Sequence, residues 1–376
     1  MLLYFVIIAM CSLLMFFAER FHGYLKIASY ICYALVVILT STLAACRDMT
    51  CGVDIYVYEN LAFNQAKAAE DFSQLCDSSL LEPLFLFINY SAAGISNHIG
   101  AAFFLIQAII MSLWVAACVK VKDMVPSWIT LPLLILGFYP LSFNLMRQCL
   151  AIAFLTYAYA DLLKTDNLKR FVVMCVLAYF FHKTAVAAGV LLLVIHWAWS
   201  LKSDAKKKFF FVMICLGCFL VVFLFIQVLE LIGGLGGKFA QYAVYGGTEG
   251  GKRGFKPGIL TILLFGEVLC LFVTIFLYKK NLLSKRIAYV YSLILVASIA
   301  FENLGRYAGY ATRFDMYFCA LQCFFIPIVF RSKSLSPKMR MLGSVLSVLI
   351  FIAVFMRLSD SMGGTVPYRS SLLGFV

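Results

Sequence analysis

The sequence predicts an all-α polytopic membrane protein with about twelve transmembrane helices, within a range of about ten to thirteen. Of its 376 residues, 64% are hydrophobic and only 13% are charged, and the mean hydropathy is +0.96. A soluble domain is roughly 45–50% apolar and about 25% charged. Most apolar runs between charge clusters are roughly 17–23 residues long, which suits a hydrocarbon core about 30 Å thick. Short basic loops separate alternate runs, as the positive-inside rule requires.

The predicted crossings together form a single integral membrane domain, 1–376. An additional run, 83–95, is short and contains Asn89, so we expect a re-entrant or interfacial helix there, within an outside loop that covers 46–98. The predicted crossings are 1–18, 27–45, 99–119, 127–141, 146–163, 170–181, 184–200, 209–231, 258–278, 287–303, 314–330 and 340–356.

The positions of Lys and Arg predict the topology. The segment 46–82 carries seven acidic residues against two basic ones, and we place it outside. Both termini are then outside as well. Basic loops inside the cell also account for the formal net charge of +13, so we expect no nucleic-acid partner. The inside loops, each with two to four Lys or Arg, are 19–26, 120–123, 164–170, 202–208, 279–286 and 331–340.

A second long outside loop, 232–257, is rich in glycine and therefore has a flexible backbone. Two roles fit such a loop: a lid over a site, or a mobile connector. It is not a phosphate-binding P-loop, because Gly237-Lys238 is followed by Phe239 where a Ser or Thr would hold Mg²⁺. No internal repeat is visible in the chain, which disfavours an inverted-repeat transporter.

Most of the 13 cysteines lie in apolar runs, where a cysteine behaves as a small buried hydrophobe. Cys46, Cys51 and Cys76 fall in the outside loop, and whether they form a disulfide stays open. No Cys-x-x-Cys pair accompanies a pair of histidines, so the spacing indicates no zinc site.

Polar and charged residues gather at the predicted outer ends of the helices, although they come from distant parts of the chain. Charges at such positions are costly and commonly functional. Arginine binds phosphate oxygens through its planar fork, so the set predicts a site for an anionic lipid-linked substrate. Its members are Arg47, Asp48, Asp54, Glu82, Arg147, Gln148, His182, Arg306, Arg313 and Tyr368.

Structural roles stay open for several of these residues. Arg147 is the hardest to explain in this way, because its connection is too short to be a solvated loop. The structural alternatives are an anchor at Arg47 paired with Asp48, a cap by Glu82 for the helix that starts at Pro83, a helix-end hydrogen bond for His182, and pairing of Arg306 and Arg313 with Glu302 and Asp315.

Five motifs in order along the chain carry a family resemblance. They resemble those of the EpsG-like proteins, which are Wzy-type polymerases of bacterial surface polysaccharides such as O-antigen or capsule. One departure is that Tyr56 follows Asp54 too closely, so Tyr58 fits the expected tyrosine better. The motifs are Arg47 with Gly52, Asp54 and Tyr58; Glu82-Pro83; Phe-Asn-x-x-Arg-Gln-x-Leu-Ala at 143–151; Phe-His-x-Thr-Ala at 181–185; and Pro367-Tyr368.

The resemblance implies a membrane fold of the GT-C type in the cytoplasmic (inner) membrane of a bacterium. It implies an enzyme that takes undecaprenyl-diphosphate-linked oligosaccharide repeat units at the outer face, facing the periplasm or exterior. The growing glycan is transferred onto the non-reducing end of a new unit. A flippase supplies the substrate, and a chain-length regulator is a further possible partner. No metal and no cofactor are expected.

The expected reaction assigns a role to each candidate residue. Arginines would stabilise the departing diphosphate, and a carboxylate or imidazole would accept or orient the acceptor hydroxyl. The expected diphosphate ligands are Arg147, Arg47, Arg306 and Arg313; the candidate bases are Asp54, His182 and Glu82; and the supporting residues are Asn144, Gln148, Tyr58 and Tyr368.

Two other functions stay open. A lipid-glycan ligase, or another GT-C glycosyltransferase, would share the topology and the arginine chemistry. A transporter of polysaccharide or lipid-linked sugar would instead hold its polar residues near the bilayer midplane. The predicted set lies at one boundary of the membrane, which favours the polymerase.

Overall fold

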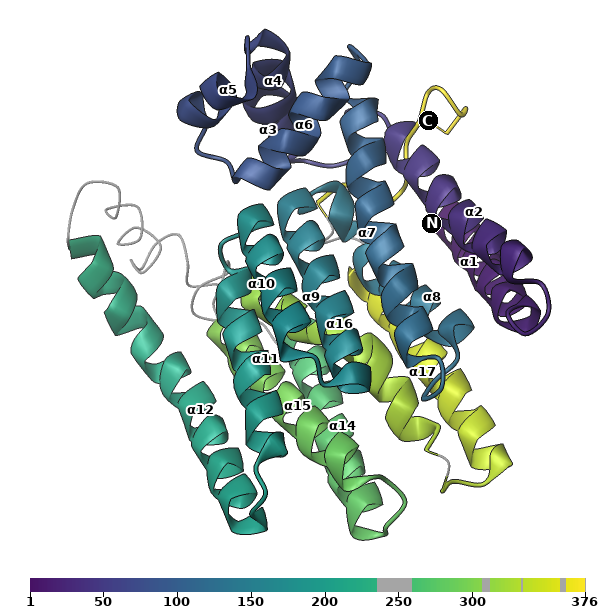
Figure 1. Cartoon of the computed structure of the whole chain (residues 1–376), viewed down its shortest axis with the longest axis vertical. Coiled ribbons are helices and arrows are strands. Elements are labelled where there is room, and N and C mark those ends of the chain that lie inside the picture. Colours follow the sequence, from purple (N-terminus) through teal and green to yellow (C-terminus); the bar gives the residue numbers. More distant parts are fainter. Residues whose placement is uncertain (235–258, 306–311, 333, 359–362, 376) are drawn as a thin grey trace. The chain divides into compact units, whose positions relative to one another are not determined.

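The computed structural model describes residues 1–234, 259–305, 312–332, 334–358 and 363–375. Within these ranges every regular element is a helix, apart from one isolated bridge between Ser370 and Phe375. This confirms the all-α prediction. The chain forms two compact units, Met1–Val186 with Met341–Val376, and Ala187–Arg340. Figure 1 shows the helices of each unit.

The predicted ranges agree with the helices of the first unit to within a few residues. The predicted run 27–45 is α2, for example, and 83–95 is α6. The helices up to the end of this unit's first segment are α1 (Leu2–Phe21), α2 (Lys26–Ala45), α3 (Ile55–Tyr58), a π-helical turn (Glu59–Phe63), α4 (Asn64–Ala68), α5 (Phe72–Ser78), α6 (Pro83–Ile95), α7 (Gly100–Val121), α8 (Ser127–Phe138), a 3-10 turn (Leu141–Phe143), α9 (Met146–Thr165) and α10 (Leu168–Phe181).

The apolar helices of the described chain differ in whether they are long enough to cross a membrane. Five helices of the described chain have the length and hydropathy to cross a membrane, namely Leu2–Phe21, Lys26–Ala45, Gly100–Val121, Lys285–Leu304 and Arg313–Phe330, and three shorter ones are apolar, namely Pro83–Ile95, Ser127–Phe138 and Ala185–Ser200. Twelve crossings therefore stay a prediction. The helices after α10 are α11 (Ala185–Ser200), α12 (Asp204–Gly234), α14 (Ile259–Lys279), α15 (Lys285–Gly305), α16 (Thr312–Phe330) and α17 (Pro337–Leu358).

The segment 46–82, for which no helix was predicted, contains α3, α4, α5 and the π-helical turn. Asp71 caps α5, because its side chain accepts a hydrogen bond from the Gln74 N–H at 2.8 Å. The buried side chains of Ala66, Leu75 and Leu86 pack together and hold α4 and α5 against α6. No helix was predicted here because the many acidic residues of the segment indicated a polar loop, although Ala66 and Leu75 are apolar and buried.

The core of the first unit is built around α7 and α9. Helix α7 packs against both α2 and α9, and α10 packs on the other side of α9. Trp114 in the middle of α7 is fully buried. Helix α9 is buried along most of its length and carries alanines at 151, 153, 158 and 160, and small residues of this kind let membrane helices approach closely.

Asp161 joins α7, α9 and α10 at the end of α9 opposite Arg147. Its carboxylate is 3% exposed and lies 2.6 Å from Lys120 Nζ and 3.0 Å from Arg170 Nη1. Both cations are partly exposed, at 33% and 45% of their side chains. The carboxylate therefore sits in a buried position but is fully compensated, which makes this ion triad a structural link between three helices.

Replacement of Asp161 by Asn is expected to lower the free energy of unfolding by about 1–2 kcal/mol, because charge-assisted hydrogen bonds are lost while the two freed cations can rehydrate. Thermal unfolding of the purified protein in detergent measures this change. An unaltered midpoint would show that the triad contributes nothing to stability. The variant should otherwise retain normal function, which makes it a control for the other end of α9.

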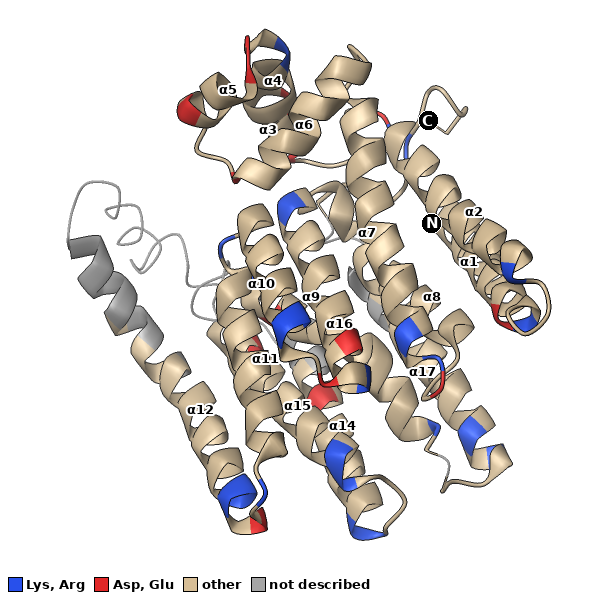
Figure 2. Cartoon of the chain, in the orientation of Figure 1, with Lys and Arg blue, Asp and Glu red and all other residues tan. Residues whose placement is uncertain are grey.

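The second unit is organised around α15, which packs against α12, α14 and α16. The rings of Tyr291 on α15 and Phe325 on α16 stack with their centroids 5.1 Å apart. Lys285 Nζ lies 2.7 Å from an Asp204 carboxylate oxygen, at the start of both α15 and α12. Figure 2 shows the basic residues of these helices near helix ends rather than along their middles.

Candidate functional site

The candidate site is built around a short break between α8 and α9. Pro140 cannot donate the N–H that would continue α8, a single 3-10 turn follows at Leu141–Phe143, and α9 begins at Met146. Ser142 and Asn144 are buried. The break therefore places polar groups inside the protein, in agreement with the expectation that it is too short to be a solvated loop.

Arg47 is buried beside this break, just past the end of α2, and is only 5% exposed. Its guanidinium donates to the carbonyl of Ala44 at 3.2 Å and to that of Phe143 at 3.4 Å. The guanidinium carbon lies 3.7 Å from the ring centroid of Phe103 and 4.4 Å from that of Phe143. The two rings thus stabilise a buried cation through cation–π contacts. Burial lowers the pKa of Arg47 to about 10, so the side chain stays charged at neutral pH.

The alternative in which Asp48 pairs with Arg47 is wrong. Both carboxylate oxygens of Asp48 accept a hydrogen bond from the Ser371 N–H at 2.9 Å, and one also accepts from the Ser371 hydroxyl at 2.7 Å. These hydrogen bonds lower the pKa of Asp48 below its usual value. Asp48 therefore holds the C-terminal tail rather than the arginine.

Arg147, in the first turn of α9, forms an ion pair with Glu82. Arg147 Nη1 lies 2.5 Å from Glu82 Oε2, and the two side chains are 26% and 7% exposed. The Tyr58 ring centroid is 6.0 Å from the guanidinium carbon, and Phe85 packs edge-on against Tyr58 at 5.6 Å. Glu82 precedes Pro83 at the start of α6, but its side chain makes no cap hydrogen bond. The alternative of a helix cap is therefore wrong, and the carboxylate serves Arg147.

Asn144 connects the break to two other segments. Its side-chain oxygen lies 3.4 Å from the Asp54 N–H, and its amide nitrogen donates to the Gly363 carbonyl at 2.9 Å. The Val53 N–H donates to the same Gly363 carbonyl, also at 2.9 Å. One amide side chain thus joins the start of α3, the start of α9 and the C-terminal tail.

Gly52 and Gly363 make this arrangement possible. Their φ angles are +133° and +64°, values that favour glycine. A Cβ at Gly52 would lie 2.6 Å from Asn144 Oδ1, and one at Gly363 would lie 2.3 Å from Asn144 Nδ2. Neither position has room for a side chain while Asn144 stays in place.

Asp54 starts α3 and is half-buried. Its backbone carbonyl accepts from the N–H groups of Val57 and Tyr58 at 3.1 and 3.2 Å. Within the described residues the Asp54 carboxylate itself forms no hydrogen bond and no ion pair. It is therefore held next to Asn144 by its backbone, with both carboxylate oxygens open to a ligand.

His182 ends α10, and its Nδ1 lies 2.8 Å from the Thr184 hydroxyl. The stacked rings of Phe154 and Phe181, 5.2 Å apart, pack the end of α10 against α9. Because α9 and α10 are antiparallel neighbours (Figure 1), His182 lies at the end of the pair that also carries Arg147. The expected helix-end hydrogen bond is present, and it orients the imidazole.

Two supporting residues are buried in the same unit. Gln148 lies in the first turn of α9 and is 2% exposed. Tyr368 donates its hydroxyl to the Leu43 carbonyl at 2.7 Å, and its ring meets that of Tyr4 edge-on at 6.3 Å. Tyr4 in turn donates to the Thr365 carbonyl at 2.6 Å. Tyr368 therefore anchors the tail on α2.

The other two predicted diphosphate ligands, Arg306 and Arg313, do not belong to the described residues of the first unit. Arg306 lies outside the described residues, as does most of the predicted outside loop 232–257. Arg313 is exposed at the start of α16 in the second unit. The alternative in which it pairs with Asp315 is wrong, because the Asp315 carboxylate accepts instead from Ser298 and Cys319. The role of Arg306 and Arg313 as phosphate ligands stays a prediction.

The sequence predicted Tyr368 of the C-terminal tail as a supporting residue of the site, but it did not predict where the tail docks. The tail reaches back to the residues after α2: the Asp48 N–H donates to the Arg369 carbonyl at 2.9 Å, and the Ser370 hydroxyl donates to the Cys46 carbonyl at 2.5 Å. Contacts of this sequence separation leave no local pattern. The adjacent glycines at 363 and 364, both of which have a positive φ, were the local feature that pointed to a turn in the tail. Cys46, Cys51 and Cys76 are free thiols, so no disulfide ties this region.

These features define a helical membrane protein with a polar site that combines a buried arginine, an arginine–glutamate pair and an open carboxylate. The chain belongs to the EpsG family, whose model matches residues 30–370. EpsG-like proteins are Wzy-type polysaccharide polymerases. The matched range runs from α2 to the docked tail, so it contains every described residue of the site. Comparison with curated proteins and with solved structures finds no match.

Proposed function

We propose that this protein is a glycosyltransferase-type polymerase that joins undecaprenyl-diphosphate-linked oligosaccharide repeat units at the outer face of a bacterial cytoplasmic membrane. Membership of the EpsG family supports polysaccharide polymerisation in general. The observation that carries the finer proposal is Arg147, which is held by Glu82 yet remains 26% exposed. A preorganised, accessible guanidinium is suited to a diphosphate.

Arg147 would stabilise the leaving group. The sugar donor carries a diphosphate on its anomeric carbon, so the departing group needs positive charge rather than a proton. The Nε atom of Arg147 is buried and has no hydrogen-bond partner among the described residues, so it is the partly exposed remainder of the guanidinium that would meet a phosphate oxygen first. Arg47 is enclosed by two rings and bonds two carbonyls, so it would act at longer range, through its charge.

Asp54 is the best-placed base in the described structure. Its carboxylate has no partner among the described residues, whereas that of Glu82 is occupied by Arg147. The acceptor hydroxyl oxygen would bond the anomeric carbon as the carbon–diphosphate bond breaks, with its proton passing to Asp54 and the bonding electrons leaving with the lipid diphosphate. Such a direct displacement inverts the anomeric centre. His182 is the alternative base, or a phosphate ligand when protonated.

The supporting residues would hold this arrangement in place. Asn144 fixes the backbone at Asp54. Gln148 follows Arg147 directly in the chain, and the Tyr58 ring centroid lies 6.0 Å from the Arg147 guanidinium carbon. A GT-C type fold, a flippase that delivers the substrate and a chain-length regulator belong to the same proposal. No step in it requires a metal ion.

The proposal is tested by the size of the glycan made by a strain that lacks the gene. Surface glycan from the deletion strain, with and without a plasmid copy of the wild-type gene, is separated on a gel, and membrane levels are checked by blot. We expect single capped repeat units in the deletion and long chains after complementation.

Three results would overturn the polymerase. Carrier-linked long chains that are not passed to their final acceptor would indicate a ligase. Repeat units that accumulate on the cytoplasmic side, measured by their resistance to an enzyme added outside spheroplasts, would indicate transport. Long surface chains in the deletion strain would remove all three functions.

A further inference from the structure

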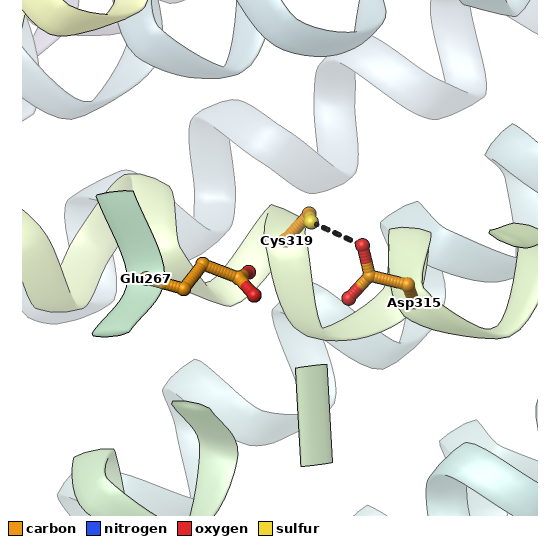
Figure 3. A group of neighbouring side chains, drawn as sticks. All are labelled: Glu267, Asp315 and Cys319. Carbon is orange, nitrogen blue, oxygen red and sulfur yellow. Dashed lines mark hydrogen bonds between the residues drawn. The ribbon is translucent and has the colours of Figure 1, made fainter. Parts of the chain in front are cut away.

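The second unit holds a cluster of buried polar side chains on apolar helices, between the middle of α14, the second half of α15 and the N-terminal and middle turns of α16. Glu267 lies on α14, Ser298 on α15, and Asp315, Cys319 and Gln322 on α16. The three α16 residues share one face of the helix, because they are four and three positions apart. Figure 3 shows Glu267 extending from α14 toward Asp315 and Cys319.

Ser298 is the centre of this cluster. Its hydroxyl lies 2.5 Å from Glu267 Oε1 and also hydrogen-bonds Asp315 Oδ1. Gln322 donates from one nitrogen to Glu267 Oε1 at 2.5 Å and to the Ser298 hydroxyl oxygen at 3.0 Å. The Cys319 thiol donates to Asp315 Oδ2 at 3.0 Å. The five side chains therefore form one connected polar network.

The network has more negative charge than its partners can compensate. Within the described part of the chain, neither Glu267 nor Asp315 forms an ion pair. Glu302, also buried, is near enough to interact electrostatically with Glu267. Ser298 has a single hydroxyl proton and cannot donate to two carboxylates at once. At least one additional positive charge, a proton or a metal ion, is needed to make this burial tolerable.

The surroundings of Glu267 Oε2 indicate whether this positive charge is a proton or a metal ion. This oxygen has no hydrogen-bond partner among the described residues, although the Glu267 residue is only 6% exposed. Ligand atoms of Glu267, Asp315 and Cys319 all lie within 4.8 Å of one another. A proton shared at Ser298 would leave Oε2 unsatisfied, whereas a metal ion bound between these three side chains would satisfy it.

We infer that Glu267, Asp315 and Cys319 form a binding site for a divalent transition-metal ion, with Zn²⁺ as the best fit. Zinc accepts mixed thiolate and carboxylate ligands, whereas Mg²⁺ and Ca²⁺ avoid sulfur. Two carboxylates and a thiolate also supply enough negative charge to neutralise a doubly charged ion. The site is distinct from the arginine site of the first unit and does not depend on the proposed polymerase.

Binding requires only small movements and a release of protons. Zinc bonds of about 2.0–2.3 Å in a tetrahedron place ligand atoms about 3.3–3.8 Å apart. Side-chain rotations that move the ligand atoms by roughly 1 Å would bring them from their present separation of up to 4.8 Å to this distance. The Cys319 proton, and any proton held between the carboxyl groups, would leave to solvent as the metal–ligand bonds form. The fourth position would be taken by the Ser298 hydroxyl or a water molecule. The ion would then link α14 to α16.

The inference is tested on the purified full-length protein in detergent. The protein is stripped with a chelator, dialysed against Zn²⁺ and analysed for bound metal by mass spectrometry, and Co²⁺ is added separately to record the absorption bands of a cobalt–thiolate bond. We expect one tightly bound zinc per chain, a cobalt–thiolate band and a higher unfolding temperature with zinc.

Variants separate this site from adventitious binding to the other cysteines. Glu267→Gln and Cys319→Ser should each weaken zinc binding by more than about 100-fold, since loss of even an outer-shell partner costs about 10–100-fold. Cys323→Ser, one helical turn along α16, should bind as the wild type does. The inference is overturned if the wild type retains no zinc after dialysis, or if Cys319→Ser retains the cobalt–thiolate band. An unfolding temperature that zinc leaves unchanged would equally overturn it.

Discussion

Replacing Arg147 by alanine is expected to reduce polymer formation by roughly 100- to 1,000-fold while the protein remains at its normal level in the membrane. Loss of a single preorganised donor at a developing negative charge has an effect of this size. Arg147 is suited to that task because Glu82 fixes one end of its guanidinium at 2.5 Å while the side chain stays partly exposed. The measurement is the length distribution of surface glycan from a deletion strain that carries the variant.

Two companion variants serve as comparisons for Arg147→Ala. Arg147→Lys keeps the charge but loses the planar fork, so an intermediate loss would indicate bidentate binding. Asp161→Asn removes an ion triad at the other end of the same helix, and it should leave chain length unchanged. Full-length polymer from Arg147→Ala at a normal membrane level would show that Arg147 is not in the active site.

A double variant distinguishes a catalytic arginine from a structural ion pair. If Arg147 serves only to neutralise the buried Glu82, removal of both residues should restore much of what the single Arg147 variant loses, because no unpaired charge remains. If Arg147 binds the diphosphate, Arg147→Ala combined with Glu82→Ala should remain as inactive as Arg147→Ala alone. The thermal stability of the same proteins reports the structural part of the effect.

Replacing Gly52 by alanine is expected to lower the free energy of unfolding by roughly 1–3 kcal/mol, because a side chain is forced into an unfavourable backbone conformation. The added Cβ would also lie 2.6 Å from Asn144 Oδ1 and displace the side chain that holds the Asp54 N–H. A displacement near 1 Å at a reacting group can cost about 100-fold in rate. Polymer length and unfolding temperature should therefore both fall.

Gly94→Ala is the matched control for this prediction. Gly94 lies in α6 with nothing within 4 Å of an added Cβ and without a positive φ. An alanine there should be neutral or slightly stabilising, since alanine is the better helix former. Unchanged stability and polymer length in Gly52→Ala would show that Asn144 and the start of α3 do not need this turn.

The sequence by itself determined the long apolar helices and the position of the polar residues at their ends, but not the short helices of the segment 46–82. Long apolar runs bounded by basic loops can form only helices in a membrane, because each backbone N–H and C=O must be satisfied within its own segment. The same local logic located the short helix 83–95 and the unusual arginine at the start of α9. The order of the motifs around Arg47, Arg147 and His182 also indicated the EpsG family, which the match over residues 30–370 confirms.

Only the tertiary structure decided which partners these residues have. Arg47 contacts two aromatic rings rather than Asp48, and Glu82 contacts Arg147 rather than its own helix. The tail docks on Asn144 across more than two hundred residues of chain. Periodicity and hydropathy are properties of neighbouring residues, whereas each of these contacts depends on how helices that are distant in sequence pack together.

The cluster of Glu267, Ser298, Asp315 and Cys319 makes the same point most clearly. Each residue alone is a single polar side chain in an apolar helix, and no spacing along the chain links α14 to α16. Their hydrogen bonds and shared space arise only when these helices pack with α15. The sequence therefore determined where the helices are, and packing determined which polar groups meet inside them.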